Sequence, residues 1–150
     1  MVKVFALAIS LLLSSCSVAR DLVVTHELEE EILEAVFRYQ LEHCYTKRSP
    51  GVYFLSRHDQ DLSDSFMEKF KGHRPPVRKR SQMVGDFMDK ESGVQGIILD
   101  VEGIKWVRRR EIEVEGACVA GGLDGHGYLY RVVRERDRWV VQGSQGTWIS

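Results

Sequence analysis

The residues best placed for chemistry in this sequence are Asp124 and His126, which lie in the glycine-rich segment 121–127. Successive backbone N–H groups in such a segment can form a nest for an anion, with His126 as a titratable contact. The segment precedes a predicted strand instead of a helix, so no helix dipole is available to hold a phosphate. The pattern therefore favours the alternative, a wide hairpin loop, and Asp124 and His126 remain a candidate polar pair.

No motif of a known catalytic or metal site is present. The sequence lacks a Cys-x-x-Cys pair, a Gly-x-Ser-x-Gly elbow and a Walker loop, and residues 26–30 lack the second histidine of a zinc-protease helix. The five histidines are scattered: His26, His43, His58, His73 and His126. We therefore expect no metal, no cofactor and no catalytic residue.

Three further polar side chains belong to a helix predicted from His26 to about Cys44, with Thr25 as its N-cap. At about 100° per residue, its apolar side chains form two stripes, and Tyr39 belongs to the first. Glu29 and Gln40 project between the stripes. They line a cavity beneath a sheet in one interpretation and face a groove between packed elements in the other, which the pattern favours.

Two basic clusters lie in the second half of the chain, and their candidate anion-binding residues are Arg78, Lys79, Arg80, Arg108, Arg109 and Arg110. One interpretation, favoured by the pattern, is strand edges kept soluble by charge. The other is a patch for anionic lipid headgroups, lipopolysaccharide or an acidic partner protein. Without Lys3 the chain has 20 basic and 22 acidic residues, and this balance argues against nucleic-acid binding.

The first 15 residues have the features of an export signal. Lys3 precedes an apolar stretch from Val4 to Leu13, which is too short to span a bilayer as a helix of about 20 residues. An ordinary signal peptide cut after Ala19 is one interpretation. The other, which we favour, follows from the next residues.

The tetrapeptide Leu13-Ser14-Ser15-Cys16 resembles the lipobox of bacterial lipoprotein precursors. The resemblance implies cleavage before Cys16 and a lipid on that cysteine, which would anchor the protein to the membrane. Ser17 stands where the family has an aspartate for inner-membrane retention. The resemblance therefore implies an outer-membrane lipoprotein with its domain in the periplasm.

The two remaining cysteines, Cys44 and Cys118, would form an even pair of thiols in an oxidising compartment. Cys118 shares a predicted strand face with Ile112 and Val114, and Cys44 ends the predicted helix. We expect a disulfide between them if the second stripe of the helix also approaches the sheet. Otherwise both thiols stay free.

The domain is predicted to be α+β: one long N-terminal helix wrapped by a curved, mostly antiparallel sheet, with a second short helix. A signal peptide (1–15) and a tether (16–24) precede this single domain (25–150). Strands are predicted at Val52–Ser56, Val77–Met83 and Ile97–Glu102, and the alternation resumes at Ile104–Val107 after an interruption at Gly103. A three-stranded meander from Glu111 to Ser150, which alternates apolar and polar residues, follows.

The order of these elements resembles that of cone-shaped, nuclear-transport-factor-2-like and cystatin-like domains, as do the closing segments Tyr130–Val133, Trp139–Val141 and Trp148–Ser150. No catalytic motif of the enzymes in that class matches this sequence, so the resemblance implies a shape and not a reaction.

We therefore expect a lipid-anchored, non-enzymatic binding or assembly module of the cell envelope. The alternative is a small cone-shaped enzyme with a buried cavity containing Glu29, Tyr39 or His126. A filled interior beneath the sheet would favour the module, and an open pocket with convergent polar groups would favour the enzyme.

Overall fold

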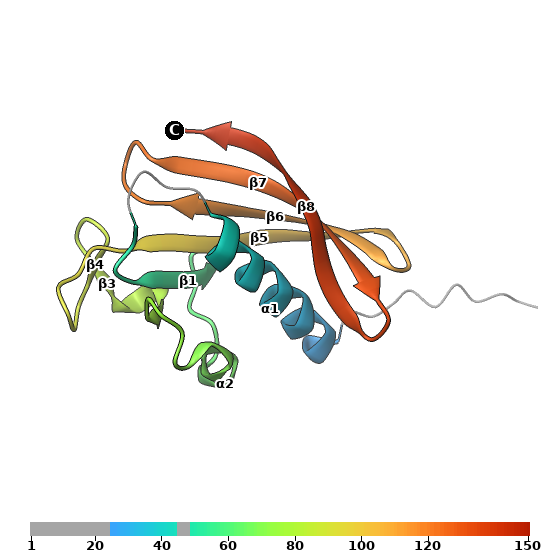
Figure 1. The fold of residues 1–150 in the computed structure, drawn as a ribbon, viewed down its shortest axis with the longest axis horizontal. Coiled ribbons are helices and arrows are strands. Elements are labelled where there is room, and N and C mark those ends of the chain that lie inside the picture. Colours follow the sequence, from blue (N-terminus) through green and yellow to red (C-terminus); the bar gives the residue numbers. More distant parts are fainter. Residues whose placement is uncertain (1–24, 45–48) are drawn as a thin grey trace, which may run out of the picture.

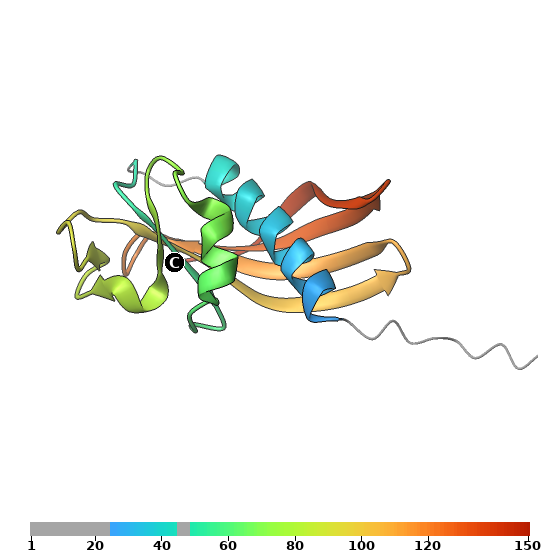
Figure 2. The ribbon, with the colours of Figure 1, turned by 90° about the horizontal axis from the view of Figure 1, so that it is seen from below.

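The structure, a computed structural model, describes residues 25–44 and 49–150. It is an α+β fold dominated by a six-stranded mixed sheet, with helix α1 (His26–His43) lying across one face of the sheet (Figure 1). A short helix, α2 (Asp64–Met67), and the 3-10 turn η1 (Glu68–Phe70) lie beside α1 on the same face (Figure 2).

Local signals explain where the helices begin. The Thr25 hydroxyl accepts a hydrogen bond from the Leu28 N–H at 3.2 Å, and Glu27 and Glu29 in the first turn of α1 complement the helix dipole. The Ser63 hydroxyl caps α2 in the same way, by accepting from the N–H of Phe66.

The strands of the main sheet are β1 (Tyr53–Arg57), β2 (Val77–Lys79), β5 (Ile97–Arg108), β6 (Glu111–Val119), β7 (Gly125–Glu135) and β8 (Arg138–Ile149). Their order is β2-β1-β5-β6-β7-β8. Strand β1 runs parallel to both β2 and β5, and the remaining neighbours are antiparallel. A 3-10 turn, η2 (Arg80–Gln82), leads to a separate two-stranded sheet, β3 (Met83–Val84) with β4 (Met88–Asp89).

The main core lies between α1 and the sheet. Helix α1 contributes Ile32, Leu33, Val36 and Phe37, and the sheet contributes alternate residues of β1, β5, β6 and β7. A smaller cluster of Val52, Phe54 and Ile98 lies on the other face of the sheet, where Met83 and Phe87 of the β3–β4 segment cover it.

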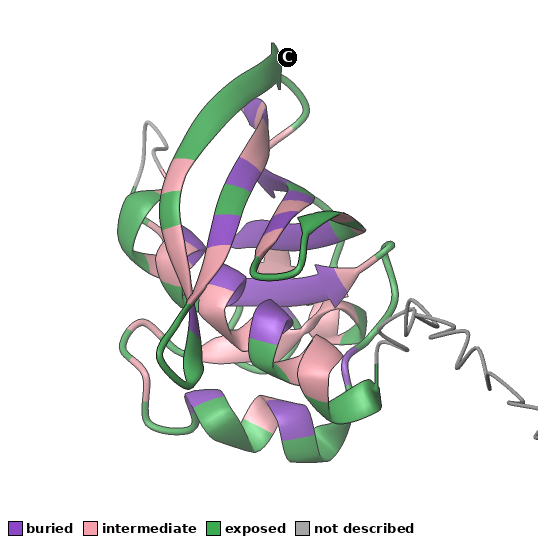
Figure 3. Ribbon diagram, turned by 90° about the vertical axis from the view of Figure 1, so that its right-hand side faces the viewer, coloured by how far each residue is buried: buried purple, intermediate pink, exposed green. Residues whose placement is uncertain are grey.

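The buried hydrophobic side chains of the described ranges all lie between Ile32 and Trp139. Figure 3 shows the consequence, because burial concentrates in the inner strands while most of β8 is exposed. A chain that starts at Cys16 therefore keeps every one of these core residues, and we expect it to fold without the leader.

The predicted α+β class is confirmed, and so is the antiparallel meander, which corresponds to β6, β7 and β8. The predicted arrangement of one long helix wrapped by a mostly antiparallel sheet is not confirmed. The sheet is mixed, because the chain between β1 and β5 returns to give parallel pairs. The strand predicted at Val77–Met83 was also too long, since it ends at Lys79 and continues as η2.

Candidate functional site

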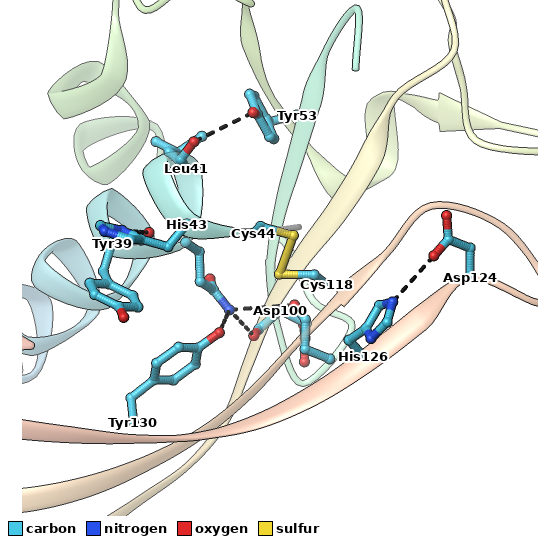
Figure 4. Close-up of a disulfide and its surroundings, with 12 residues drawn as sticks. Tyr39, Leu41, His43, Cys44, Tyr53, Asp100, Cys118, Asp124, His126 and Tyr130 are labelled. Carbon is cyan, nitrogen blue, oxygen red and sulfur yellow. Dashed lines mark hydrogen bonds and ion pairs between the residues drawn. A yellow bond between two sulfur atoms is a disulfide. The ribbon is translucent and has the colours of Figure 1, made fainter. Parts of the chain in front are cut away.

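The space between α1 and the inner strands of the sheet is filled around Gln40. The hollow that remains there measures only about 10 Å³, no more than one water molecule needs. Its lining consists of Tyr39, His43, Cys44, Tyr128, Tyr130 and Ser144. Figure 4 shows Tyr39 of α1 and Tyr130 of β7 in this region. Their ring centroids are 5.8 Å apart in an edge-to-face contact.

Gln40 is a structural anchor at this place. It is 1% exposed, and its Nε2 lies 3.2 Å from the backbone oxygen of Asp100, 3.4 Å from that of Ala117 and 3.2 Å from the Tyr130 hydroxyl oxygen. Burial raises the pKa of Tyr130 far above its ordinary value, so the hydroxyl stays neutral and cannot act as a base. The Nε2 group of Gln40 thus ties α1 to β5, β6 and β7.

Glu29 is not brought together with Gln40. The two residues are 11 positions apart on α1, which corresponds to about 16 Å along the helix axis. Glu29 forms an ion pair with Arg57 at the end of β1, beside a hollow of about 280 Å³ that includes Leu33 and Phe66 in its lining. Burial lowers the pKa of Arg57.

Asp124 and His126 do form a pair. The Nε2 atom of His126 lies 3.3 Å from Oδ1 of Asp124, and both side chains are about one-fifth exposed (22% and 19%). The imidazole lies nearly parallel to the ring of Tyr128, with centroids 6.4 Å apart. Among the described residues, no hydroxyl or thiol side chain hydrogen-bonds to this pair, so the geometry supplies no nucleophile for it to activate.

The structure joins Cys44 and Cys118 by a disulfide, with Cα atoms 6.2 Å apart (Figure 4). This Cα separation falls within the usual range for bridged cysteines. Cys44 is the C-cap of α1 and Cys118 is completely buried in β6, so the bridge fixes the end of the helix to the centre of the sheet.

The two basic clusters do not form one surface. Lys79 and Leu99 each pair with Leu55 in the sheet, and Arg108 lies nine positions after Leu99 along β5, a distance of about 30 Å. The first cluster is also neutralised by ion pairs: Arg78 with Glu91 at 3.0 Å, Lys79 with Asp64 at 2.7 Å and Arg80 with Asp59 at 3.9 Å.

Sequence reasoning missed a buried carboxylate, Asp100. This side chain is 7% exposed and accepts hydrogen bonds from the Ser56 hydroxyl and, at 3.3 Å, from the Asp59 N–H. Burial raises the pKa of Asp100, although both hydrogen bonds act against this shift. The alternation of apolar and polar residues in β5 placed Asp100 on the polar face of the strand. No residue near Asp100 in the sequence indicated that other parts of the chain cover this end of that face.

Sequence reasoning also missed an open groove of about 890 Å³ between α1 and the beginning of β8. Its apolar lining includes Ala35, Tyr39, Trp139 and Val141, and its charged lining consists of Glu31, Glu34, Arg38, Glu42, Asp137 and Arg138. Sequence spacing alone could not reveal it, because the two sides of the groove are about 100 residues apart in the chain.

The wall that α1 contributes to the groove is acidic. Burial by itself would raise the pKa of Glu34, but hydrogen bonds from Arg38 and Lys69 outweigh it and lower that pKa. Arg38 donates a hydrogen bond to Glu34 at 2.8 Å, and Lys69 donates one to Glu34 at 3.0 Å, so Glu34 stays ionised. Glu31 and Glu42 are exposed on the same wall. The groove therefore suits a partner segment with apolar and basic side chains.

Comparison of the chain with protein-family models, curated proteins and solved structures finds no match. Within residues 25–44 and 49–150, no three His, Cys, Asp or Glu side chains are grouped so that they could hold a metal ion. No helix in these same ranges has the length and the apolar composition that crossing a membrane requires. Cys16 lies outside the described residues.

Proposed function

We propose that this chain is a lipid-anchored, non-enzymatic binding or assembly module of the cell envelope, held by Cys16 at the outer membrane with its domain in the periplasm. The observation that carries the proposal is the filled space around Gln40, between α1 and strands β5, β6 and β7. A cone-shaped enzyme needs an open pocket with convergent polar groups at that place. Here the residual hollow is about 10 Å³, and Nε2 of Gln40 is committed to backbone carbonyls and Tyr130.

The anchor and the location rest on the sequence. The lipobox-like residues Leu13 to Cys16 follow an apolar stretch of suitable length, and Ser17 favours the outer membrane by the same resemblance. A bridge between Cys44 and Cys118 fits the oxidising environment of an exported protein. The finer expectation of a cone, with a curved sheet around α1, also belongs to this proposal and is supported by the position of α1 across one face.

The groove between α1 and β8 is the surface that we assign to an envelope protein partner. Its apolar lining offers burial, and Glu31 and Glu42 offer charge to a basic segment. The alternative function, a small enzyme, is favoured by one observation only, the hydrogen-bonded pair of Asp124 and His126.

Site-specific photocrosslinking in the producing cell tests the binding function. A photoreactive amino acid replaces Glu31 or Glu42 in the groove, and in matched controls it replaces exposed residues elsewhere, Lys90 or Leu123. We expect a discrete adduct of higher mass from the groove positions and none from the controls. Absence of any adduct from the groove, or equal adducts from all four positions, would contradict the proposed partner surface.

A further inference from the structure

Two runs of arginine that are far apart in the sequence meet at one end of the fold. The β5–β6 turn carries Arg108, Arg109 and Arg110, and the β7–β8 hairpin carries Arg134, Arg136 and Arg138. Two hydrogen bonds join them: the Arg134 N–H donates to the Arg110 carbonyl at 2.9 Å, and the side-chain Nη2 of Arg110 donates to the Arg134 carbonyl at 3.0 Å. We call these six arginines the hairpin-tip surface.

The hairpin-tip surface is basic even after the acids of its own two segments are counted. Six arginines face three acids, Glu111, Glu135 and Asp137, so segments 108–111 and 134–138 together carry a net charge of +3. Glu111 is already paired with Arg108 at 3.0 Å and with Arg131 at 2.7 Å.

Three of the six guanidinium groups are free to bind a partner. The side chains of Arg109, Arg136 and Arg138 are exposed, and none of them forms an ion pair with another described residue. The remaining arginines have local roles, such as Arg134 over the ring of Trp139 at 5.7 Å. Figure 3 looks onto this end of the molecule and shows the turns as exposed.

The hairpin-tip surface lies at the end of the molecule where α1 begins. In Figures 1 and 2 both turns project past the first residues of α1. The first turns of α1 carry four acids, Glu27, Glu29, Glu30 and Glu31, of which Glu29 is paired with Arg57. Cys16 precedes Thr25 by nine residues, which span about 30 Å at most. A lipid on Cys16 would therefore keep this end of the domain close to the membrane.

We propose that the hairpin-tip surface docks on the phosphate groups of anionic lipids in the membrane that holds the anchor. This inference rests on the proposed lipid anchor for its orientation. Guanidinium groups suit the task because their planar fork donates two parallel hydrogen bonds to phosphate oxygens. The surface orients the domain on the bilayer and leaves the opposite end, with α2 and the β3–β4 hairpin, turned toward the periplasm.

The test uses the mature chain from residue 16 with Cys16→Ser, so that binding is measured without a lipid. Sedimentation is measured with vesicles of phosphatidylglycerol and phosphatidylcholine in equal parts and with vesicles of phosphatidylcholine alone. The hairpin-tip variant is Arg109→Gln/Arg136→Asn/Arg138→Gln, where asparagine suits the positive φ of 54° at Arg136. The matched control, Lys71→Gln/Arg74→Gln/Lys90→Gln, removes the same charge from exposed residues at the other end.

In this Cys16→Ser background, the chain without further substitutions is the reference, called the wild type here. We expect it to bind the anionic vesicles only, and its binding to weaken as salt is added. Each arginine at an anionic surface contributes roughly a fivefold change in partition, so the hairpin-tip variant loses up to about a hundredfold. The control variant keeps wild-type binding, and phosphate competes no better than chloride at equal ionic strength.

Three results would overturn the inference: no binding of the wild type to anionic vesicles, an equal loss in the control variant, or strong competition by inorganic phosphate, which would indicate a discrete phosphate site. Palmitate labelling of Cys16 in cells is independent of all three. A failure of the anchor is therefore distinguishable from a failure of the hairpin-tip surface.

Discussion

Removal of the bridge between Cys44 and Cys118 is expected to destabilise the domain strongly. The two residues are 74 positions apart, and Cys118 is completely buried. In the chain-entropy model, cross-linking a loop of this length stabilises the fold by about 4.5 kcal/mol, mainly by restricting the unfolded chain. That is a large fraction of the 5 to 15 kcal/mol by which folded domains are typically stable.

The assay is urea unfolding of the mature Cys16→Ser chain, followed by circular dichroism with and without reductant. For a typical dependence on urea of about 2 kcal/mol per molar, loss of the bridge lowers the midpoint by about 2 M. Cys44→Ala/Cys118→Ala should unfold at a similarly low midpoint. Reductant should leave this variant unchanged, which separates loss of the bridge from other effects of the reductant.

Thiol counting on the denatured, unreduced Cys16→Ser chain gives the direct check. The bridge predicts no free thiol per monomer. Two free thiols per chain would refute the bridge, and an unchanged midpoint after complete reduction would refute the stabilisation calculated from the loop.

Three further predictions follow from single contacts. Gln40→Leu should lower the free energy of unfolding by about 1 to 3 kcal/mol in a urea titration, because buried hydrogen bonds to two carbonyls and a hydroxyl are lost; an unchanged value would deny that Gln40 is an anchor. Asp100 has a raised pKa in the folded state, so its own contribution to stability should fall as the pH rises above about 4. The melting temperature of the wild type relative to that of Asp100→Asn should therefore fall over this pH range, and a difference that does not change with pH would contradict the shift. A Cβ added at Gly127 would overlap the indole of Trp148, so Gly127→Ala should change the tryptophan fluorescence, whereas Gly146→Ala, where the added atom meets open space, should not.

The parts of the fold that follow from local pattern could be predicted. In β6 and β7, alternation placed Ile112, Val114 and Cys118 on one face with Tyr130 and Val132, and all five are buried in the main core. The signal is reliable here because each strand pairs with its neighbour in sequence through a short turn.

The parts that depend on contacts distant in sequence could not be predicted. Nothing local indicates that β1 pairs in parallel with β5, and this pairing gives Asp100 the buried neighbour Ser56. The predicted strand Val77–Met83 failed because η2 interrupts it after Lys79.

The candidate site residues, too, could be predicted where they are close in sequence and could not where they are distant. Asp124 and His126 were adjacent enough in sequence to be recognised as a pair, and the structure brings them together. The hairpin-tip surface was only half recognised, because Arg108–Arg110 were noted without Arg134, Arg136 and Arg138. Only the register of β6 with β7, in which Glu111 pairs with Val133, brings the two runs together.

Lipidation of Cys16 is the central claim, because both the envelope location and the orientation of the hairpin-tip surface depend on it. The direct measurement is labelling of growing bacterial cells with radioactive palmitate, followed by isolation of the protein. We predict label on the wild type, the same label on Cys44→Ala/Cys118→Ala, and none on Cys16→Ser. An unlabelled wild type, or label that persists on Cys16→Ser, would contradict the anchor.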